Sequence, residues 1–137
     1  MNAYERLLKY VVIRTPSNEE SETTPSSQCQ FDLANVLKKE MEELGICDVT
    51  LTDTCFLYGK IPATPGCENA PAIGFIAHMD TVSDYCDHDI KPMITENYDG
   101  EALALGESEL VLSPEMFPHL KSLKGRTLIT SDGTTIL

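Results

Sequence analysis

His78 and Asp80 lie two residues apart in the stretch AIGFIAHMDTV, directly after a run of apolar residues. A neutral imidazole is a common zinc ligand, and a ligating histidine usually donates its second ring N–H to a carboxylate or carbonyl that fixes its orientation. Side chains two positions apart on a strand point to the same side, so the two can meet if the strand continues to Asp80. We therefore interpret His78 as a metal ligand and Asp80 as the catalytic-site carboxylate that orients it.

The His-x-Asp pair alone is not specific, because a single histidine at a strand end is more often a hydrogen-bonded structural residue. A zinc site also needs further His, Cys or carboxylate ligands in a defined geometry. An acidic cluster without apolar neighbours is usually an exposed loop, and the nearby stretch SDYCDHDI is of this kind. It contains the other local candidates, which are Asp84, Asp87, His88 and Asp89. Cys86 lies among them, and acidic neighbours raise a thiol pKa, which argues against a cysteine nucleophile.

The apolar run before His78, residues 72–77, predicts a strand that is covered on both faces inside an α/β sheet. In open α/β sheets, ligands bind in the crevice beyond the carboxyl ends of the strands. The predicted strand would therefore deliver His78 and Asp80 to a position where function is expected.

The first helix is predicted from apolar residues at helical spacing between Tyr4 and Val12. It should end before Thr15–Pro16 and place its apolar stripe in the core. Residues 17–28 are rich in Ser, Thr and Glu and lack a periodic apolar face, so we expect a loop there.

A second helix is expected to begin with Ser26 or Ser27 as its N-cap and to end at Gly45. Alternating apolar and polar residues over 47–62 then predict two short strands that turn near Asp53.

In the last third, a strand fragment with a turn at 97–100 is expected first. A short helix is then predicted from Pro114 to a stop at Gly125. Its buried residues would be Met116, Phe117 and Leu120.

The dipeptide Asp132–Gly133 between two apolar stretches is a strong hairpin signal. The expected strand residues are Leu128 and Ile129 on one side and Ile136 and Leu137 on the other. If the edge of this hairpin over 125–137 is open, we expect the chain to self-associate.

The composition sets limits on the class of protein. The chain has 137 residues, 42% of them hydrophobic, which suits one globular domain. Its formal net charge of -12 argues against nucleic acid as a partner. From the sequence we expect neither a signal peptide nor a membrane-spanning run. The five cysteines lack a Cys-x-x-Cys pattern and are expected to be free thiols in a reducing cytoplasm.

The stretch FIAHMDTV resembles the His-x-Asp motif of the co-catalytic dizinc peptidases related to aminoacylase and carboxypeptidase G. Other stretches are similar to the amino-terminal part of the bacterial tripeptide aminopeptidases of this family, so the resemblance covers essentially the whole chain. These stretches are NAYERLLKYVVIRTPSNEES, KKEMEELGICDVTLTD, IKPMITENYDG and LVLSPEMFPHLKSLKGRTLITSDGTTIL.

The resemblance implies an α/β fold, with a mixed sheet and flanking helices, as the amino-terminal part of a dizinc-peptidase catalytic domain. It implies a cytoplasmic hydrolase that uses two zinc ions to release the amino-terminal residue of tripeptides. His78 would be a ligand to one zinc ion, and Asp80 would hold its imidazole.

The resemblance also implies that residues 1–137 are a partial catalytic domain. The bridging aspartate, the general-base glutamate, the other ligands and an inserted second domain would follow Leu137. Since a partial ligand set does not fix the geometry of the ion, we expect weak or absent zinc binding and no useful catalysis by this chain alone. The alternative is a non-catalytic binding or assembly module that retains the start of the fold.

Overall fold

Short helices and short antiparallel strands make up the chain, as the computed structural model shows for residues 1–86 and 88–137. These elements confirm the α/β class. They divide into two units, which are described separately: unit 1 is Met1–Arg14 with Ser83–Leu137, and unit 2 is Thr15–Val82. Among the described residues, none of the helices is long and apolar enough to cross a membrane.

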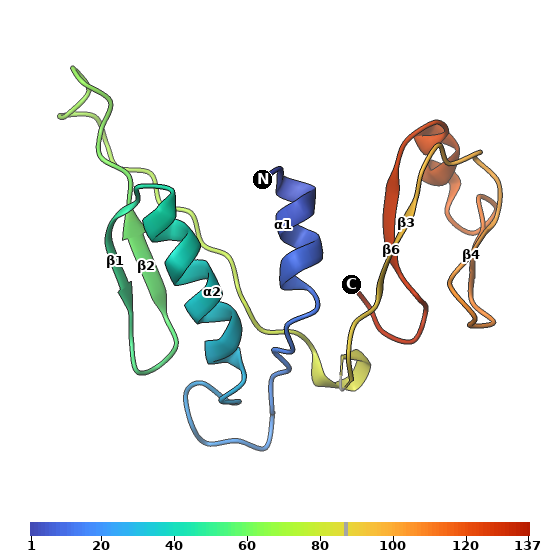
Figure 1. Cartoon of the computed structure of the whole chain (residues 1–137), viewed down its shortest axis with the longest axis horizontal. Helices are drawn as coiled ribbons and strands as arrows, with labels where there is room; N and C mark the ends of the chain where they lie inside the picture. Colours follow the sequence, from blue (N-terminus) through green and yellow to red (C-terminus); the bar gives the residue numbers. More distant parts are fainter. Residues whose placement is uncertain (87) are drawn as a thin grey trace. The chain divides into compact units, whose positions relative to one another are not determined.

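Unit 2 is built from one helix and one hairpin (Figure 1). Helix α2 spans Gln30–Glu43, and strands β1 (Cys47–Leu51) and β2 (Leu57–Lys60) pair antiparallel, as predicted. The turn between the strands includes Asp53.

The end of α2 is fixed by Gly45, as predicted from the sequence. Gly45 has φ +77, its N–H donates to the Glu42 carbonyl at 3.0 Å, and the Ile46 N–H donates to the Met41 carbonyl at 3.0 Å. This pair of bonds is a Schellman motif, which satisfies two carbonyls at the end of a helix. It turns the chain directly from α2 into β1.

Helix α2 packs against the β1–β2 hairpin. Gly59 in β2 makes the close approach possible, because a Cβ there would lie 2.4 Å from Met41 Cε and 2.6 Å from Ile46 Cγ2. Leu33 and Ala34 of α2 are buried. The small core of unit 2 therefore lies between α2 and one face of the hairpin.

The start of α2 differs from the prediction, because Cys29, and not Ser26 or Ser27, is the N-cap. The Ser26 hydroxyl oxygen instead accepts hydrogen bonds from the Asn18 N–H at 3.1 Å and the Gln30 amide at 3.3 Å. It is thus used to tie the preceding loop to the helix.

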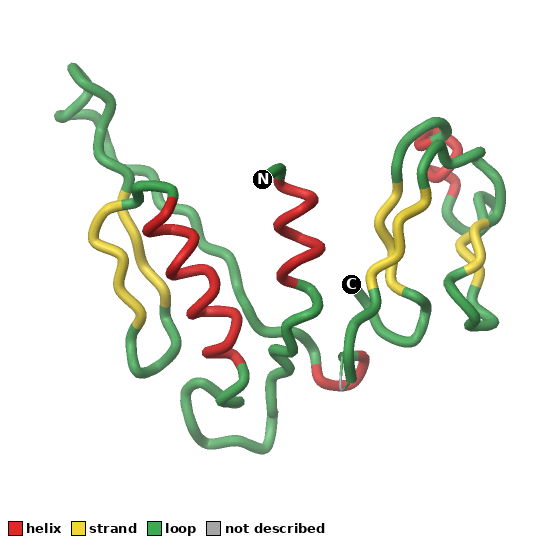
Figure 2. Tube along the Cα trace, viewed as in Figure 1, coloured by secondary structure: helices red, strands yellow, loops and turns green. Residues whose placement is uncertain are grey.

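The predicted buried strand over 72–77 is wrong in this structure. Residues 71–80 form no helix or strand (Figure 2), and Ile73, Phe75 and Ile76 are 81%, 93% and 101% exposed. A strand covered on both faces needs hydrogen-bonded neighbours and covering layers, and none of the described strands pairs with this segment. The sequence thus contains the apolar run, but no strand in the described parts of the chain lies beside it.

In its described residues, unit 1 contains one α-helix and two small sheets. Helix α1 spans Ala3–Tyr10, and its Asn2 N–H donates to Glu5 Oε2 at 2.5 Å. Short 3-10 helices span Ser83–Tyr85 (η1) and Pro118–Leu123 (η2). The antiparallel pairs are β3 (Pro92–Thr95) with β6 (Leu128–Ser131), and β4 (Leu103–Ala104) with β5 (Val111–Leu112).

The helix α1 was predicted correctly, but the placement of its apolar stripe in the core was wrong. None of its residues is buried, and Tyr4 and Leu7 are 53% and 41% exposed. None of the other described helices and strands packs extensively against α1. Its apolar face therefore stays partly exposed to solvent.

The predicted hairpin over 125–137 is also wrong, because β6 pairs with β3 and residues 134–137 form no strand. The Asp132 carboxylate accepts hydrogen bonds from the N–H and hydroxyl of Thr134, and the Ser131 hydroxyl donates to the Thr135 carbonyl. Such local side-chain hydrogen bonds provide partners for the polar groups of the turn, so a second hairpin strand is not required.

The helix expected from Pro114 begins only at Pro118 and buries Leu120, whereas Met116 and Phe117 stay exposed. A residue before proline is disfavoured in the helical region, and Phe117 has φ -124 and ψ 78. Proline at the first position therefore sets the start of this helix.

The strand fragment and the turn at 97–100 were predicted correctly.

Gly45 offers a test of the α2 stop. Gly45→Ala should lower the free energy of unfolding by about 1–2 kcal/mol, because L-residues are strained at positive φ. Gly74→Ala is the matched control, since a Cβ meets nothing within 4 Å at either position and only Gly45 has positive φ. Urea unfolding followed by circular dichroism measures both, and equal losses would contradict the assignment.

Asp132 predicts a pH dependence in unit 1. The hydroxyl of Thr134 at 2.6 Å, then its N–H and the nearby Lys91, hold the pKa of the Asp132 carboxyl below its usual value. With a lower pKa in the folded chain, the carboxylate stabilises the fold above about pH 4, and this stabilisation is lost as the pH falls through the folded pKa.

The substitution Asp132→Asn tests this prediction, because it removes the charge of the carboxylate. The difference in free energy of unfolding between wild type and variant should be largest near neutral pH and should shrink as the pH falls below about 4. A difference that stays constant across this range would show that the charge of Asp132 has no part in stability.

Candidate functional site

The structure brings His78 and Asp80 into contact within unit 2. His78 Nδ1 lies 2.8 Å from the backbone carbonyl oxygen of Asp80 and 3.3 Å from its carboxylate Oδ1. The side chains are 85% and 45% exposed, respectively. The spacing of two residues therefore does place the carboxylate beside the imidazole, although the segment is not a strand.

The partner of Nδ1 decides the tautomer of His78. A carbonyl oxygen can only accept, so the 2.8 Å contact requires a proton on Nδ1. In the neutral imidazole, Nε2 then has a free lone pair. This is the state in which a histidine can bind a metal ion through Nε2.

The residue that follows the pair fixes the position of its backbone. The Thr81 N–H donates to the Thr15 carbonyl at 2.9 Å, and the Thr81 carbonyl accepts from the Ser17 N–H at 2.8 Å. Thr15 is 2% exposed. The short parallel bridge Pro16–Thr81 thus holds the chain immediately after Asp80.

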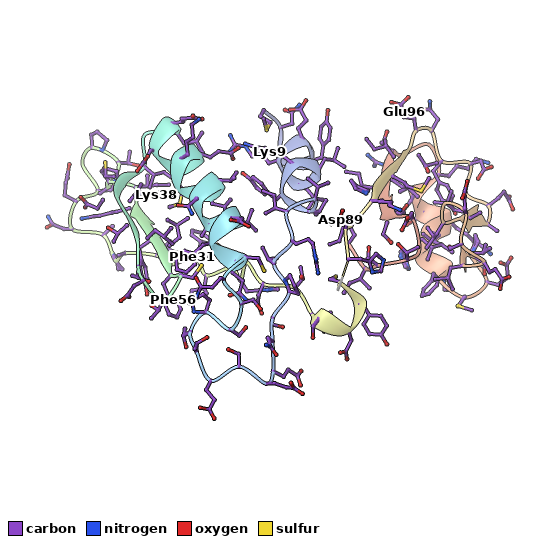
Figure 3. The ribbon with its side chains drawn as sticks, turned by 60° about the horizontal axis from the view of Figure 1, so that its bottom comes forward. Lys9, Phe31, Lys38, Phe56, Asp89 and Glu96 are labelled. Carbon is purple, nitrogen blue, oxygen red and sulfur yellow. The ribbon has the colours of Figure 1, made fainter. Side chains whose placement is uncertain are left out.

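A groove of about 820 Å³ opens beside the pair in unit 2. Helix α2, the β1–β2 turn, the loop at 23–26 and the segment over 75–80 contribute its walls. Figure 3 shows Phe31 of α2 and Phe56 of the β1–β2 turn at the same end of the unit. The groove combines apolar side chains with the polar groups of His78 and Asp80.

Sequence reasoning missed two features of this groove. One is the stacked pair Phe56 and Tyr58, with ring centroids 6.3 Å apart. The other is Cys55, whose thiol pKa is raised by burial and whose φ is +64. The alternation in the second strand could have identified the aromatic pair, but no sequence signal identifies the conformation of Cys55.

The donor set around His78 fits one metal ligand and not a complete site. Among residues 1–86 and 88–137, no group of three or more His, Cys, Asp or Glu side chains is placed to hold a metal ion. Asp84, His88 and Asp89 belong to unit 1 and form no such group, and Asp87 lies outside the described residues. The described cysteines are all free, as predicted.

Known proteins give a consistent comparison. No family model matches the sequence. The chain is 46% identical to peptidase T of Alkaliphilus oremlandii over 99% of its own length and 34% of that relative. It is 50% identical to peptidase T of Desulfitobacterium hafniense and 45% identical to that of Bacillus cereus, in both cases over 97% of its own length and 32% of the relative. The chain therefore spans about a third of the length of these relatives.

The tautomer of His78 can be measured directly. At a pH above the usual histidine pKa, ¹⁵N NMR should show Nδ1 protonated and Nε2 unprotonated, the reverse of the preference of free imidazole side chains in water. The exposed His119 is the internal control and should show the ordinary preference.

The same spectra separate the two acceptors. Asp80→Ala removes the carboxylate but keeps the backbone carbonyl at 2.8 Å, so the Nδ1–H preference of His78 should persist. Loss of that preference in the variant would show that the carboxylate, and not the carbonyl, selects the tautomer.

Proposed function

We propose that this chain, which is homologous to peptidase T along 97–99% of its length, is the amino-terminal part of a metal-dependent aminopeptidase. The observation that supports this role most directly is the contact of 2.8 Å between His78 Nδ1 and the backbone carbonyl oxygen of Asp80, which leaves Nε2 available for a metal ion. The homology supports a peptidase, which is a hydrolase acting on peptides. We further propose that it acts in the cytoplasm and that its substrates are tripeptides, from which it releases the amino-terminal residue.

His78 and Asp80 have different roles in the proposed zinc site. His78 would bind one of two zinc ions through Nε2, while the carbonyl and carboxylate of Asp80 hold the ring in place. When bound, zinc supplies a Lewis acid and lowers the pKa of a bound water molecule. The other ligands and the general base would come from residues outside this chain, and residues 1–137 would form part of one catalytic domain.

A second candidate is a non-catalytic binding or assembly module. It is favoured by the finding that, in the described parts of the chain, no group of three or more His, Cys, Asp or Glu side chains is placed to hold a metal ion. Both candidates predict that the isolated chain binds zinc weakly, so a complete peptidase is needed to distinguish them.

The test uses a chimera in which this chain replaces the matched third of Desulfitobacterium hafniense peptidase T. His78→Ala should lower the zinc content and abolish tripeptide cleavage. Asp80→Asn should lower zinc affinity or rate by about tenfold, toward the lower end of the ~10–100-fold range for such partners, because its backbone carbonyl remains. His119→Ala, which removes an exposed histidine elsewhere, should change neither quantity.

Zinc content after dialysis against chelators and the rate of tripeptide hydrolysis are measured for each variant. A His78→Ala chimera that keeps two zinc ions and near-normal turnover would exclude the ligand role. An unmodified chimera that binds zinc but cleaves no peptide would favour the non-catalytic module.

A further inference from the structure

The peptide group between Asp80 and Thr81 connects the His78 contact to the loop at 15–17. Its carbonyl oxygen, which is that of Asp80, lies 2.8 Å from His78 Nδ1. Its N–H, which is that of Thr81, donates to the Thr15 carbonyl at 2.9 Å. Because a trans peptide group is planar, its C=O and N–H point in fixed and opposite directions. The hydrogen bond to Thr15 therefore orients the carbonyl that holds the imidazole.

The next peptide group along the chain is held by Ser17. The Thr81 carbonyl accepts two hydrogen bonds from this residue, one from its N–H at 2.8 Å and one from its hydroxyl at 3.1 Å. A carbonyl oxygen has two lone pairs, so both donors can be accommodated. The peptide groups on both sides of Thr81 are thus held from the same loop, and this fixes the backbone dihedrals of Thr81.

The loop that carries Ser17 is itself attached to helix α2. The Ser26 hydroxyl oxygen accepts from the Asn18 N–H at 3.1 Å and from the Gln30 side-chain amide at 3.3 Å. Gln30 lies in α2 and is 8% exposed. Ser17 therefore reaches Thr81 from a loop that is joined to the core of unit 2.

We propose that Ser17 is a positioning residue for His78. Its hydroxyl keeps the Asp80–Thr81 peptide group in the orientation that holds a proton on Nδ1 and leaves Nε2 available to a metal ion. The hydrogen bonds from the imidazole through this peptide group to Thr15 form a chain, and bonds in such a chain polarise and strengthen one another. The consequence for metal binding rests on the proposed function, whereas the effect on the imidazole does not.

The first experiment is ¹⁵N NMR of the full chain at a pH above the usual histidine pKa. Ser17→Ala should lower the ratio of the Nδ1–H to the Nε2–H tautomer of His78 by about two- to fivefold, the effect expected when one hydrogen bond is weakened. Ser17→Thr keeps the hydroxyl and should restore the wild-type ratio. Ser108→Ala is the matched control, because its hydroxyl also donates to a backbone carbonyl, that of Leu105 at 2.6 Å, but belongs to unit 1.

Circular dichroism establishes that each variant is folded. If Ser17→Ala does not fold, Ser17→Cys replaces it, since a thiol has a similar size and is only a weak donor; the same decrease is expected. A folded variant without the hydroxyl that keeps the wild-type tautomer ratio would overturn the proposal. An equal change in Ser108→Ala, or a Ser17→Thr chain that does not recover the ratio, would also overturn it.

The second experiment measures zinc affinity in the chimera with Desulfitobacterium hafniense peptidase T. Ser17→Ala should lower the affinity by about two- to tenfold, below the ~10–100-fold range for a direct partner of a ligating histidine, because Ser17 acts through the backbone. If His78→Ala loses zinc and Ser17→Ala binds it as tightly as the unmodified chimera, Ser17 has no part in the metal site. If His78→Ala keeps both zinc ions, the proposed function fails, and the tautomer ratio alone decides the role of Ser17.

Discussion

A β-strand is stable only when its backbone N–H and C=O groups have partners, and this requirement controls unit 2. Strands β1 and β2 pair with each other and pack against α2, whereas residues 72–77 have no pairing strand among the described residues. Burial of a side chain such as Ile or Phe contributes about 1.5–3 kcal/mol, which this segment does not gain. His78 follows Ala77 directly, and its imidazole is 85% exposed. The apolar run and the candidate ligand are therefore both open to solvent in unit 2.

Features encoded by adjacent residues could be predicted from the sequence. The stop of α2 depends on one glycine at positive φ, and the β1–β2 hairpin depends on alternation within a short stretch. The contact between His78 and Asp80 was predicted, although the strand on which that prediction depended is absent from residues 71–80. The backbone carbonyl of Asp80, which is the nearer acceptor, could not be predicted, because every residue has one and only the conformation brings it to Nδ1.

Features that depend on distant residues were not predictable in the same way. The strand signal at Leu128 and Ile129 was real, but its partner is β3, more than 30 residues earlier, and not the residues after Asp132–Gly133. The apolar run before His78 has the composition of a buried strand, yet composition does not specify which strand lies beside it. The sequence pattern thus indicated that these segments can form strands. Which strand pairs with each of them is decided by residues far along the chain.

A crystal structure of the chimeric peptidase, with anomalous scattering recorded at the zinc edge, tests the role of His78 most directly. The account predicts that a zinc peak lies about 2.0–2.1 Å from His78 Nε2, with Nδ1 still in contact with Asp80. Zinc peaks that lie away from His78 would contradict it.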